Sequence, residues 1–431
     1  MHRGKLKGFP LCVFKELYLE QLVLKNGLKV VLESMPYLRS VSVGVWIRAG
    51  SMLENVSTNG LAHFAEHMAF EGTIHRNAKQ LAEEMDLLGG NVNASTGKLS
   101  TNYYIRVLDE HLPLAMDILA DIVIHSRYEK DIFEKEKGVI LEEISMVEDS
   151  PEEVAFDLLS EAVYGEQSLG MTVAGKPERI RAYTLGDLEE FKKRFYGPEN
   201  AVLVMTGHFD RKQALDLLER HFGAWTGAGR AFYPHTVAVP EEKCLFKEKD
   251  TEQIHLCLGY QGISVDSPDI YRMSVMNSIL GGASSSRLFQ RIREELGLAY
   301  AVDTCPYSYP GCGEFTVYAA TAPKNAGKVL EQIDLEIQKL MRDGITGREL
   351  LHAKEQLKSS YALGLEGAFS RMQSMGSQMI LMDKIVTLEE QIAGIERVNV
   401  DDVMRSVEDL ARAKRSIAVT GKRPSRYLPG L

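Results

Sequence analysis

Two histidines and a glutamate lie within about one helical turn of each other in the segment GLAHFAEHMAF, residues 60–70. On an α-helix, His63 and His67 lie one above the other, and Glu66 projects from the adjoining strip, so all three side chains can face one point. Two imidazoles beside a carboxylate suit a metal such as Zn²⁺. The order His-x-x-Glu-His is the inverted form of the commoner zinc-protease motif. The pattern therefore predicts a metal site. The alternative interpretation is an ordinary core helix that happens to carry histidine.

A catalytic zinc usually needs a third protein ligand, and the helix predicted over residues 129–149 offers two candidates. The apolar stripe of this helix is formed by Phe133, Ile140, Ile144 and Val147. Glu136 and Glu143 fall on the edge of the stripe and face inward, whereas Glu142 points away. We expect Glu143 to be the third ligand, because Glu136 lies about 10 Å along the axis and better fits a role in orienting a ligand or water. The alternative for both glutamates is an ion pair with a nearby Lys or Arg.

A family resemblance rests on these motifs together. HFAEH, followed 76 positions after its second histidine by the last Glu of EKEKGVILEEI, resembles the pitrilysin-type inverzincin metallopeptidases, which include the mitochondrial processing peptidases and their bacterial relatives. The resemblance covers nearly the whole chain, including GGNVNASTGKLSTNYY and SSSRLFQRIREELGLAYAV. It implies one Zn²⁺ per chain on His63, His67 and Glu143, with Glu66 as the catalytic base and Glu136 as a supporting glutamate.

The resemblance also implies two groups of substrate contacts. The first group lies on a strand along the cleft that pairs with the substrate backbone, and consists of Asn93, Ala94 and Ser95. The second group is Arg291 and Tyr300, which are expected near the scissile bond. Arg287 or Arg293 is an alternative to Arg291, because the spacing between this Arg and Tyr varies within the family. The segment RLFQRIREE is also typical of a solvated helix face with mixed charge.

Composition narrows the classes of partner and compartment. A net charge of −10 without a long basic cluster argues against nucleic acid and favours basic peptides. No apolar run reaches the roughly 18 residues needed to span a membrane, and the first 21 residues do not have the form of a secretory signal. The cysteines are odd in number and scattered, which indicates reduced thiols in a cytoplasmic protein. They are Cys12, Cys244, Cys257, Cys305 and Cys312.

The chain has 431 residues, too many for one ordinary hydrophobic core, and its pattern recurs. The segments that begin at Thr184 and Val398 each read as a helix, a turn and an apolar strand that ends in Thr-Gly. We therefore predict an α+β fold of two homologous domains, each with a mixed or antiparallel sheet flanked by helices. The expected boundaries are a catalytic zinc-binding domain over 1–225, a linker over 226–243 and an inactive repeat over 244–431 that contributes substrate contacts.

The resulting hypothesis is a zinc-dependent endopeptidase that hydrolyses peptides or short unfolded polypeptides, like a processing peptidase. A zinc-activated water would attack the scissile carbonyl with Glu66 as general base, and the substrate would bind as an extended strand. The resemblance adds that the two domains form half of a clamshell, which implies a homodimer or a heterodimer with a related chain. The alternatives are a non-catalytic scaffold or partner subunit of a related peptidase complex, a structural zinc protein with a fourth ligand, and a metal hydrolase for another amide.

Overall fold

The computed structural model describes residues 19–234 and 242–428. Three expectations fall wholly or partly outside these ranges: the lack of a secretory signal at the N-terminus, the state of Cys12, and the middle of the predicted linker. The other four cysteines are free thiols. Within the described ranges, no helix combines the length and the apolar character that crossing a membrane requires.

The first half of the chain forms a six-stranded mixed sheet with the order β1-β2-β6-β3-β5-β4. β2 and β6 run parallel, and the other neighbouring pairs are antiparallel. β3 and β6 are Val-rich and buried on both faces, whereas the edge strand β4 alternates exposed and half-buried residues. The strands are β1 (Leu19–Val23), β2 (Lys29–Ser34), β3 (Ser40–Ile47), β4 (Asn91–Thr96), β5 (Thr101–Leu108) and β6 (Ala201–Gly207).

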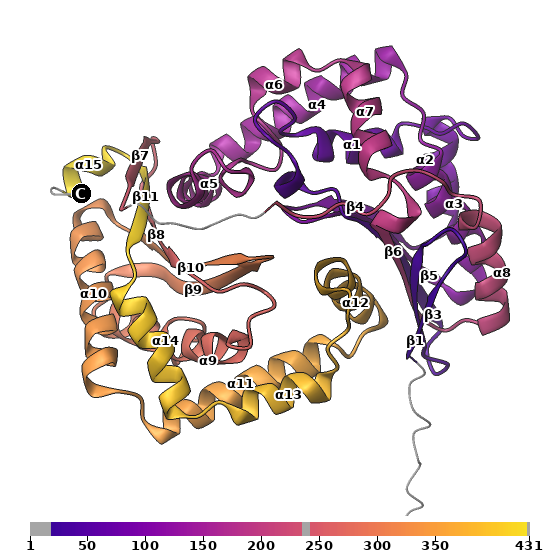
Figure 1. The fold of residues 1–431 in the computed structure, drawn as a ribbon. Helices are drawn as coiled ribbons and strands as arrows, with labels where there is room; N and C mark the ends of the chain where they lie inside the picture. The colour runs from indigo at the N-terminus through magenta and orange to yellow at the C-terminus, as the bar shows by residue number, and fades with distance from the viewer. Residues whose placement is uncertain (1–18, 235–241, 429–431) are drawn as a thin grey trace, which may run out of the picture.

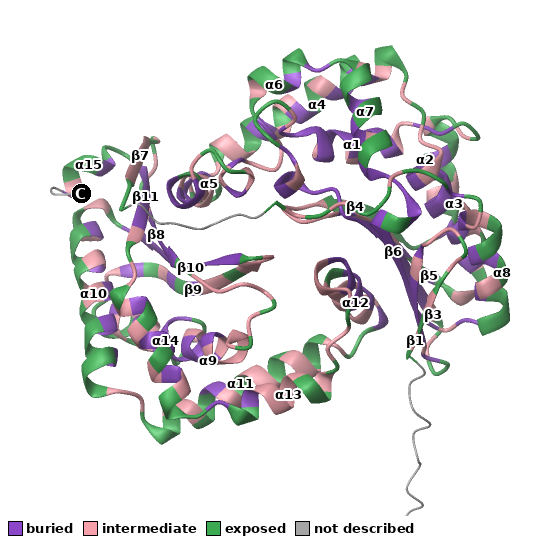
Figure 2. Cartoon of the chain, viewed as in Figure 1, coloured by how far each residue is buried: buried purple, intermediate pink, exposed green. Residues whose placement is uncertain are grey.

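All but one of the helices of the first half pack around this sheet and bury their apolar faces in one core (Figures 1 and 2). α3 has the apolar sequence LPLAMDILADIVI and lies against the sheet, and α1 lies between the sheet and the outer helices. The helices are α1 (Leu61–Phe70), α2 (Ala78–Leu87), α3 (Leu112–Ile124), α4 (Lys130–Asp149), α5 (Pro151–Tyr164), α6 (Pro177–Ala182), α7 (Leu185–Phe195) and α8 (Arg211–Phe222).

The second half forms a five-stranded sheet with the order β7-β11-β8-β10-β9 and its own core. Its strands are β7 (Cys244–Glu248), β8 (Ile254–Gln261), β9 (Ala299–Tyr309), β10 (Cys312–Thr321) and β11 (Arg415–Gly421). Its helices are α9 (Ile270–Leu280), α10 (Ala326–Asp343), α11 (Gly347–Gly364), α12 (Ala368–Met382), α13 (Leu388–Arg397), α14 (Val400–Arg412) and α15 (Pro424–Tyr427), and a π-helical turn spans Phe289–Glu295.

The two sheets share one topology. β7 pairs with β11 in parallel as β2 does with β6, and β8, β10 and β9 follow in antiparallel order as β3, β5 and β4 do. The closing units also correspond, because α7 and β6 in the first half match α14 and β11 in the second. The predicted α+β fold of two homologous units with mixed sheets is therefore confirmed.

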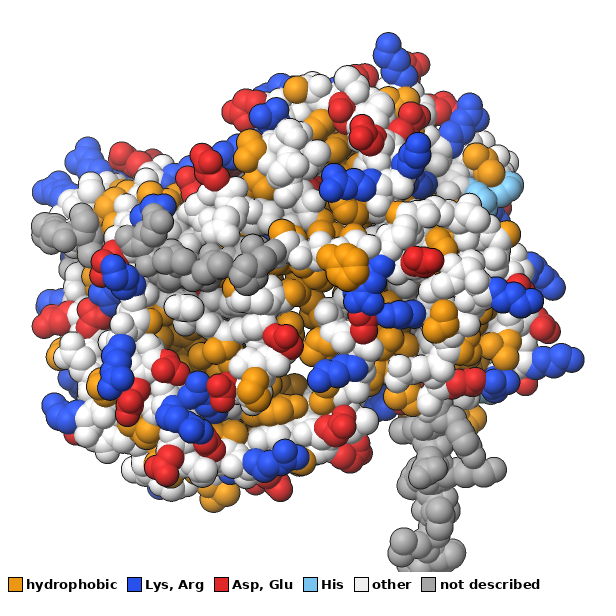
Figure 3. Space-filling model, viewed as in Figure 1, with side chains coloured by type: hydrophobic (Ala, Val, Ile, Leu, Met, Phe, Trp, Pro, Cys, Tyr) orange, Lys and Arg blue, Asp and Glu red, His pale blue; other side chains and the backbone are white. Residues whose placement is uncertain are grey.

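The two halves exchange one helix each. α5 follows α4 in the first half but packs on the second sheet, where Ser416 Oγ donates to Ala162 O at 3.1 Å. α12 belongs to the second half but covers the first sheet, and Gly376 lies so close to Trp46 that a Cβ there would meet the indole ring at 2.4 Å. Figure 1 shows both helices lying against the opposite half, and hydrophobic side chains gather where the halves face each other in Figure 3.

Candidate metal centre

Side chains from α1 and α4 converge on one point. Glu143 Oε2 lies 3.2 Å from His67 Nε2 and 3.6 Å from His63 Nε2. The three donor atoms all lie within 4.8 Å of one another. Ligands about 2.0–2.1 Å from a tetrahedral Zn²⁺ are separated by about 3.3 Å. Two imidazole nitrogens and a carboxylate oxygen at these separations fit a zinc ion with little adjustment, so the residues suit the metal.

The apolar face of α1 sets the position of this cluster. Leu61, Phe64 and Met68 are buried, and the ring of Phe64 stacks on Phe133 of α4 with centroids 4.6 Å apart. This stack fixes the distance between the two helices beside the histidines. The side chains of His63 and His67 are 18% and 16% exposed, which leaves one side of the cluster open to solvent.

His63 directs its Nε2 toward Glu143 and its Nδ1 toward the protein interior. Burial, with the nearby charge of His67, lowers the pKa of His63 to about 4. His63 is therefore neutral near pH 7, and its Nε2 lone pair is available to a cation. His63 Nδ1 is buried and has no hydrogen-bond partner among the described residues.

Glu136 contacts His67 at Nδ1, the ring nitrogen that does not face Glu143. Its Oε2 lies 3.3 Å from His67 Nδ1, and the residue is only 4% exposed. A carboxylate on Nδ1 directs Nε2 toward Glu143, which is the usual outer arrangement of a metal-binding histidine. Lys135 Nζ lies 3.4 Å from the other oxygen of Glu136 and compensates its charge. The structure thus brings Glu136 to the place expected for a supporting residue.

Glu66 lies on α1 between the histidines and accepts a hydrogen bond from Thr96 Oγ1 at the end of β4. Burial raises the pKa of Glu66, and the bond from Thr96 opposes that rise. A raised pKa brings the carboxyl group nearer to the pH at which a general base is most effective. Sequence reasoning missed Thr96, although the two-residue period of the strand places it on the same face as Ala94.

The predicted substrate strand lies at the free edge of the first sheet. Among the described residues, β4 pairs with β5 alone, and Asn93 and Ser95 are exposed. Asn93 Oδ1 accepts the main-chain N–H of Ala94 at 2.8 Å. An edge of this kind can accept an added strand.

The predicted contacts from the second half are not brought to the cluster. Arg291 donates to Glu295 Oε2 at 2.7 Å, and Tyr300 is 73% exposed on β9 beneath the guanidinium of Arg293. Arg287 is paired with Glu349. Within the described ranges, no hydrogen bond or ion pair links any of the three arginines or Tyr300 to α1 or α4.

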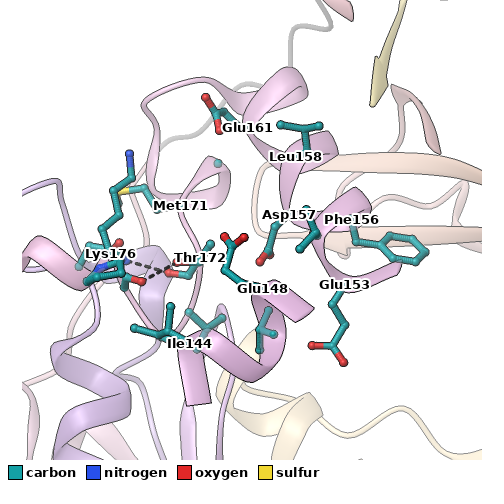
Figure 4. A pocket seen from close by; sticks show the side chains of 18 of the residues that line it. Ile144, Glu148, Glu153, Phe156, Asp157, Leu158, Glu161, Met171, Thr172 and Lys176 are labelled. Atoms are coloured by element: carbon teal, nitrogen blue, oxygen red, sulfur yellow. Dashed lines mark hydrogen bonds between the residues drawn. The ribbon is translucent and has the colours of Figure 1, made fainter. Parts of the chain in front are cut away.

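A cavity of about 1050 Å³ opens beside the cluster (Figure 4). His63 and Thr96 are among its lining residues, and α5 contributes carboxylates spaced four residues apart. These are Glu153, Asp157 and Glu161. None of them forms an ion pair with another described residue. Burial raises the pKa of Asp157, and the charge of Lys98 opposes that rise. Sequence patterns do not indicate this cavity, because its lining comes from residues as far apart in the chain as His63 and Lys247.

Comparison with known proteins places these features in a family. A sequence model of the family described as "Insulinase (Peptidase family M16)" matches residues 29–176. A second model, described as "Peptidase M16 inactive domain", matches residues 182–357. "Uncharacterized zinc protease YmxG" of Bacillus subtilis is 40% identical over 94% of this chain and 98% of its own length. A zinc protease of Mycobacterium bovis is 36% identical over 94% of each chain. The crystal structure of a protease from Helicobacter pylori superposes with a TM-score of 0.86 at 21% identity, over 94% of this chain and 99% of that one.

A duplicated α+β fold with the inverted His-x-x-Glu-His motif in its first repeat defines the inverzincin class. The chain belongs to peptidase family M16, the pitrilysin-type family that its motifs resemble. The solved relative has the same fold over nearly its whole length, and the predicted half-clamshell architecture is confirmed.

Proposed function

We propose that this chain is a zinc-dependent endopeptidase that acts on peptides or short unfolded polypeptides. The observation that carries the proposal is the cluster itself, in which His63, His67 and Glu143 converge at ligand distances with Glu66 beside them. The relatives that are named zinc proteases support it. The roles of these residues as ligands and base are part of the proposal, with one zinc per chain.

The residues of the chain supply most of the chemistry. When bound, the metal would act as a Lewis acid that activates water and polarises the scissile carbonyl. Glu66 would take the proton of the attacking water and later deliver it to the leaving amine. Thr96 would keep the carboxylate of Glu66 in place, and Glu136 would keep His67 in the orientation that a ligand needs.

Substrate would bind as an extended strand at the edge of β4. Main-chain groups of residues 93–95 would pair with the substrate backbone, as Asn93, Ala94 and Ser95 already occupy a free edge. Recognition through the main chain tolerates many sequences, which suits short unfolded polypeptides. It does not suit a folded substrate, because most backbone groups of a folded chain are already paired.

The row of carboxylates that α5 contributes to the cavity would accept a basic side chain of the substrate. Changing Glu153 to Gln together with Asp157 to Asn is expected to lower kcat/KM about tenfold for peptides with Arg near the scissile bond, because each lost charged hydrogen bond costs roughly 1.5–3 kcal/mol and water replaces part of it. The measurement is kcat/KM for a pair of peptides that differ only by Arg or norleucine at one position.

The norleucine peptide and a Glu178→Gln variant, which removes a carboxylate that α6 contributes to the same cavity, are the controls. Equal losses on both peptides would contradict a specificity role for α5.

The proposal also includes the assembly, with a homodimer or a heterodimer of related chains in the cytoplasm. Arg291 and Tyr300 would then contact substrate from the second domain, with the domains divided at 1–225, 226–243 and 244–431.

Metal removal tests the proposed activity. Dialysis against 1,10-phenanthroline is expected to abolish cleavage of quenched-fluorescence peptides, because the ligands alone cannot activate water, and Zn²⁺ at one equivalent should restore it. Zinc content is measured in parallel with the rate. A fully loaded wild-type chain that cleaves no peptide, alone or with a related chain, would refute the peptidase and favour the non-catalytic partner subunit.

A further inference from the structure

The first turn of the metal helix α1 lacks the usual capping side chain. Gly60 is its N-cap, with φ of 97° in the left-handed region, and a Cβ there would meet Ala174 O at 2.8 Å. The main-chain N–H groups of a first turn have no partners within the helix, and a buried one without a partner costs stability. Some other residue must therefore satisfy them.

Glu54 takes this place from outside the helix. Its Oε1 accepts the N–H of Ala62 at 2.7 Å, and its Oε2 accepts the N–H of Gly60 at 2.9 Å and the side-chain amide of Asn59 at 3.2 Å. Glu54 is 5% exposed. A negative charge at the N-terminus of a helix is also favoured by the helix dipole. Both carboxylate oxygens are therefore used, and both act on the turn that contains His63.

The segment that carries Glu54 is tied to the hairpin of the substrate strand. Ser51 N–H donates to Gly97 O at 3.1 Å and Met52 N–H donates to Lys98 O at 2.7 Å. Burial raises the pKa of Glu54 to about 7, and the main-chain donors and the positive charge of Lys98, which stands in the turn between β4 and β5, oppose that rise. One short segment thus contacts both the turn beside β4 and the start of α1.

We infer that Glu54 is a positioning residue, which fixes the first turn of α1 and so sets His63 against His67 and Glu143 for metal binding. His63 follows Ala62 directly, so a first turn that lost its bond to Glu54 would move one ligand while the other two stay. No substrate contact is involved. The inference rests on the proposed metal centre.

The test measures metal binding and not activity. Glu54→Gln keeps the size of the side chain but turns one acceptor into a donor that faces a main-chain N–H. We expect zinc affinity, measured by competition with a chelator, to fall about 10- to 100-fold, as for other residues that orient metal ligands. The absorption spectrum of the Co²⁺-substituted protein should also change, since a displaced His63 alters the coordination in folded molecules.

Glu314→Gln is the matched control, because Glu314 is also 5% exposed but lies on β10 and bonds to Thr316. Unchanged zinc affinity and cobalt spectrum in Glu54→Gln, or an equal loss in Glu314→Gln, would overturn the inference. If Glu54→Gln does not fold, Glu54→Asp serves: it keeps the charge, is one methylene shorter, and must also weaken zinc binding. A wild-type chain without zinc affinity would instead refute the metal centre itself, and this inference with it.

Discussion

Replacing Glu66 by Gln is expected to lower kcat about 10²- to 10⁴-fold, the range that general acid–base catalysis contributes. Gln keeps the shape of the side chain and an acceptor for the Thr96 hydroxyl, but an amide cannot take a proton from water. Zinc content should stay at the wild-type level, because Glu66 is not one of the three converging donors. The measurement is kcat on a quenched peptide, with zinc determined by atomic absorption on the same samples.

Glu83→Gln is the control for this variant. Glu83 also lies on a helix of the first half, α2, but its side chain is 63% exposed and its ion pair is with Lys79. It should match the wild type in rate and in zinc content. A Glu66→Gln enzyme that cleaves peptides as fast as the wild type would contradict the assignment of Glu66 as the base.

Glu143→Gln is expected to remove zinc from the purified protein. An amide oxygen is a much weaker zinc ligand than a carboxylate, so the affinity should fall by more than the roughly 10- to 100-fold that loss of an orienting residue costs. Peptide cleavage should fall with it. Isothermal titration with Zn²⁺ after chelator treatment measures the affinity, and circular dichroism verifies that the helices are intact.

Glu142→Gln is the natural comparison, because the residue adjoins Glu143 on α4 and its side chain is exposed. The same charge is removed from the same helix, and zinc binding should not change. Equal zinc affinity in both variants would exclude Glu143 as the third ligand and leave only the two histidines.

Helical phase accounts for what the sequence could predict of the site. His63 and His67 are four residues apart, and both present Nε2 to Glu143. The apolar stripe of α4 also predicted which glutamates face inward, because Phe133, Ile140 and Ile144 are buried and Glu136 is buried with them. Periodicity within one element is a local property, and local properties can be read from sequence.

Relations between distant elements could not be predicted in this way. Thr96 meets Glu66 across 30 residues, and no period joins a strand end to a helix. Glu54 precedes α1 by several residues, where a sequence rule expects the cap at position 60. The amphipathic patterns of α5 and α12 indicate that each buries one face, but not which sheet covers it. Arg291 and Tyr300 stay predictions for the same reason.

The exchange of α5 and α12 has a consequence for how the chain arose and how it folds. Each helix follows the long helix of its repeat, α4 or α11, so the two halves are related as the protomers of a domain-swapped dimer joined into one polypeptide. During synthesis, the face of the first sheet that carries Trp46 cannot be covered until α12 has been made, more than 300 residues later. Until α12 is made, this apolar face stays exposed to solvent, where chaperones can bind it and where it can aggregate with other unfolded chains.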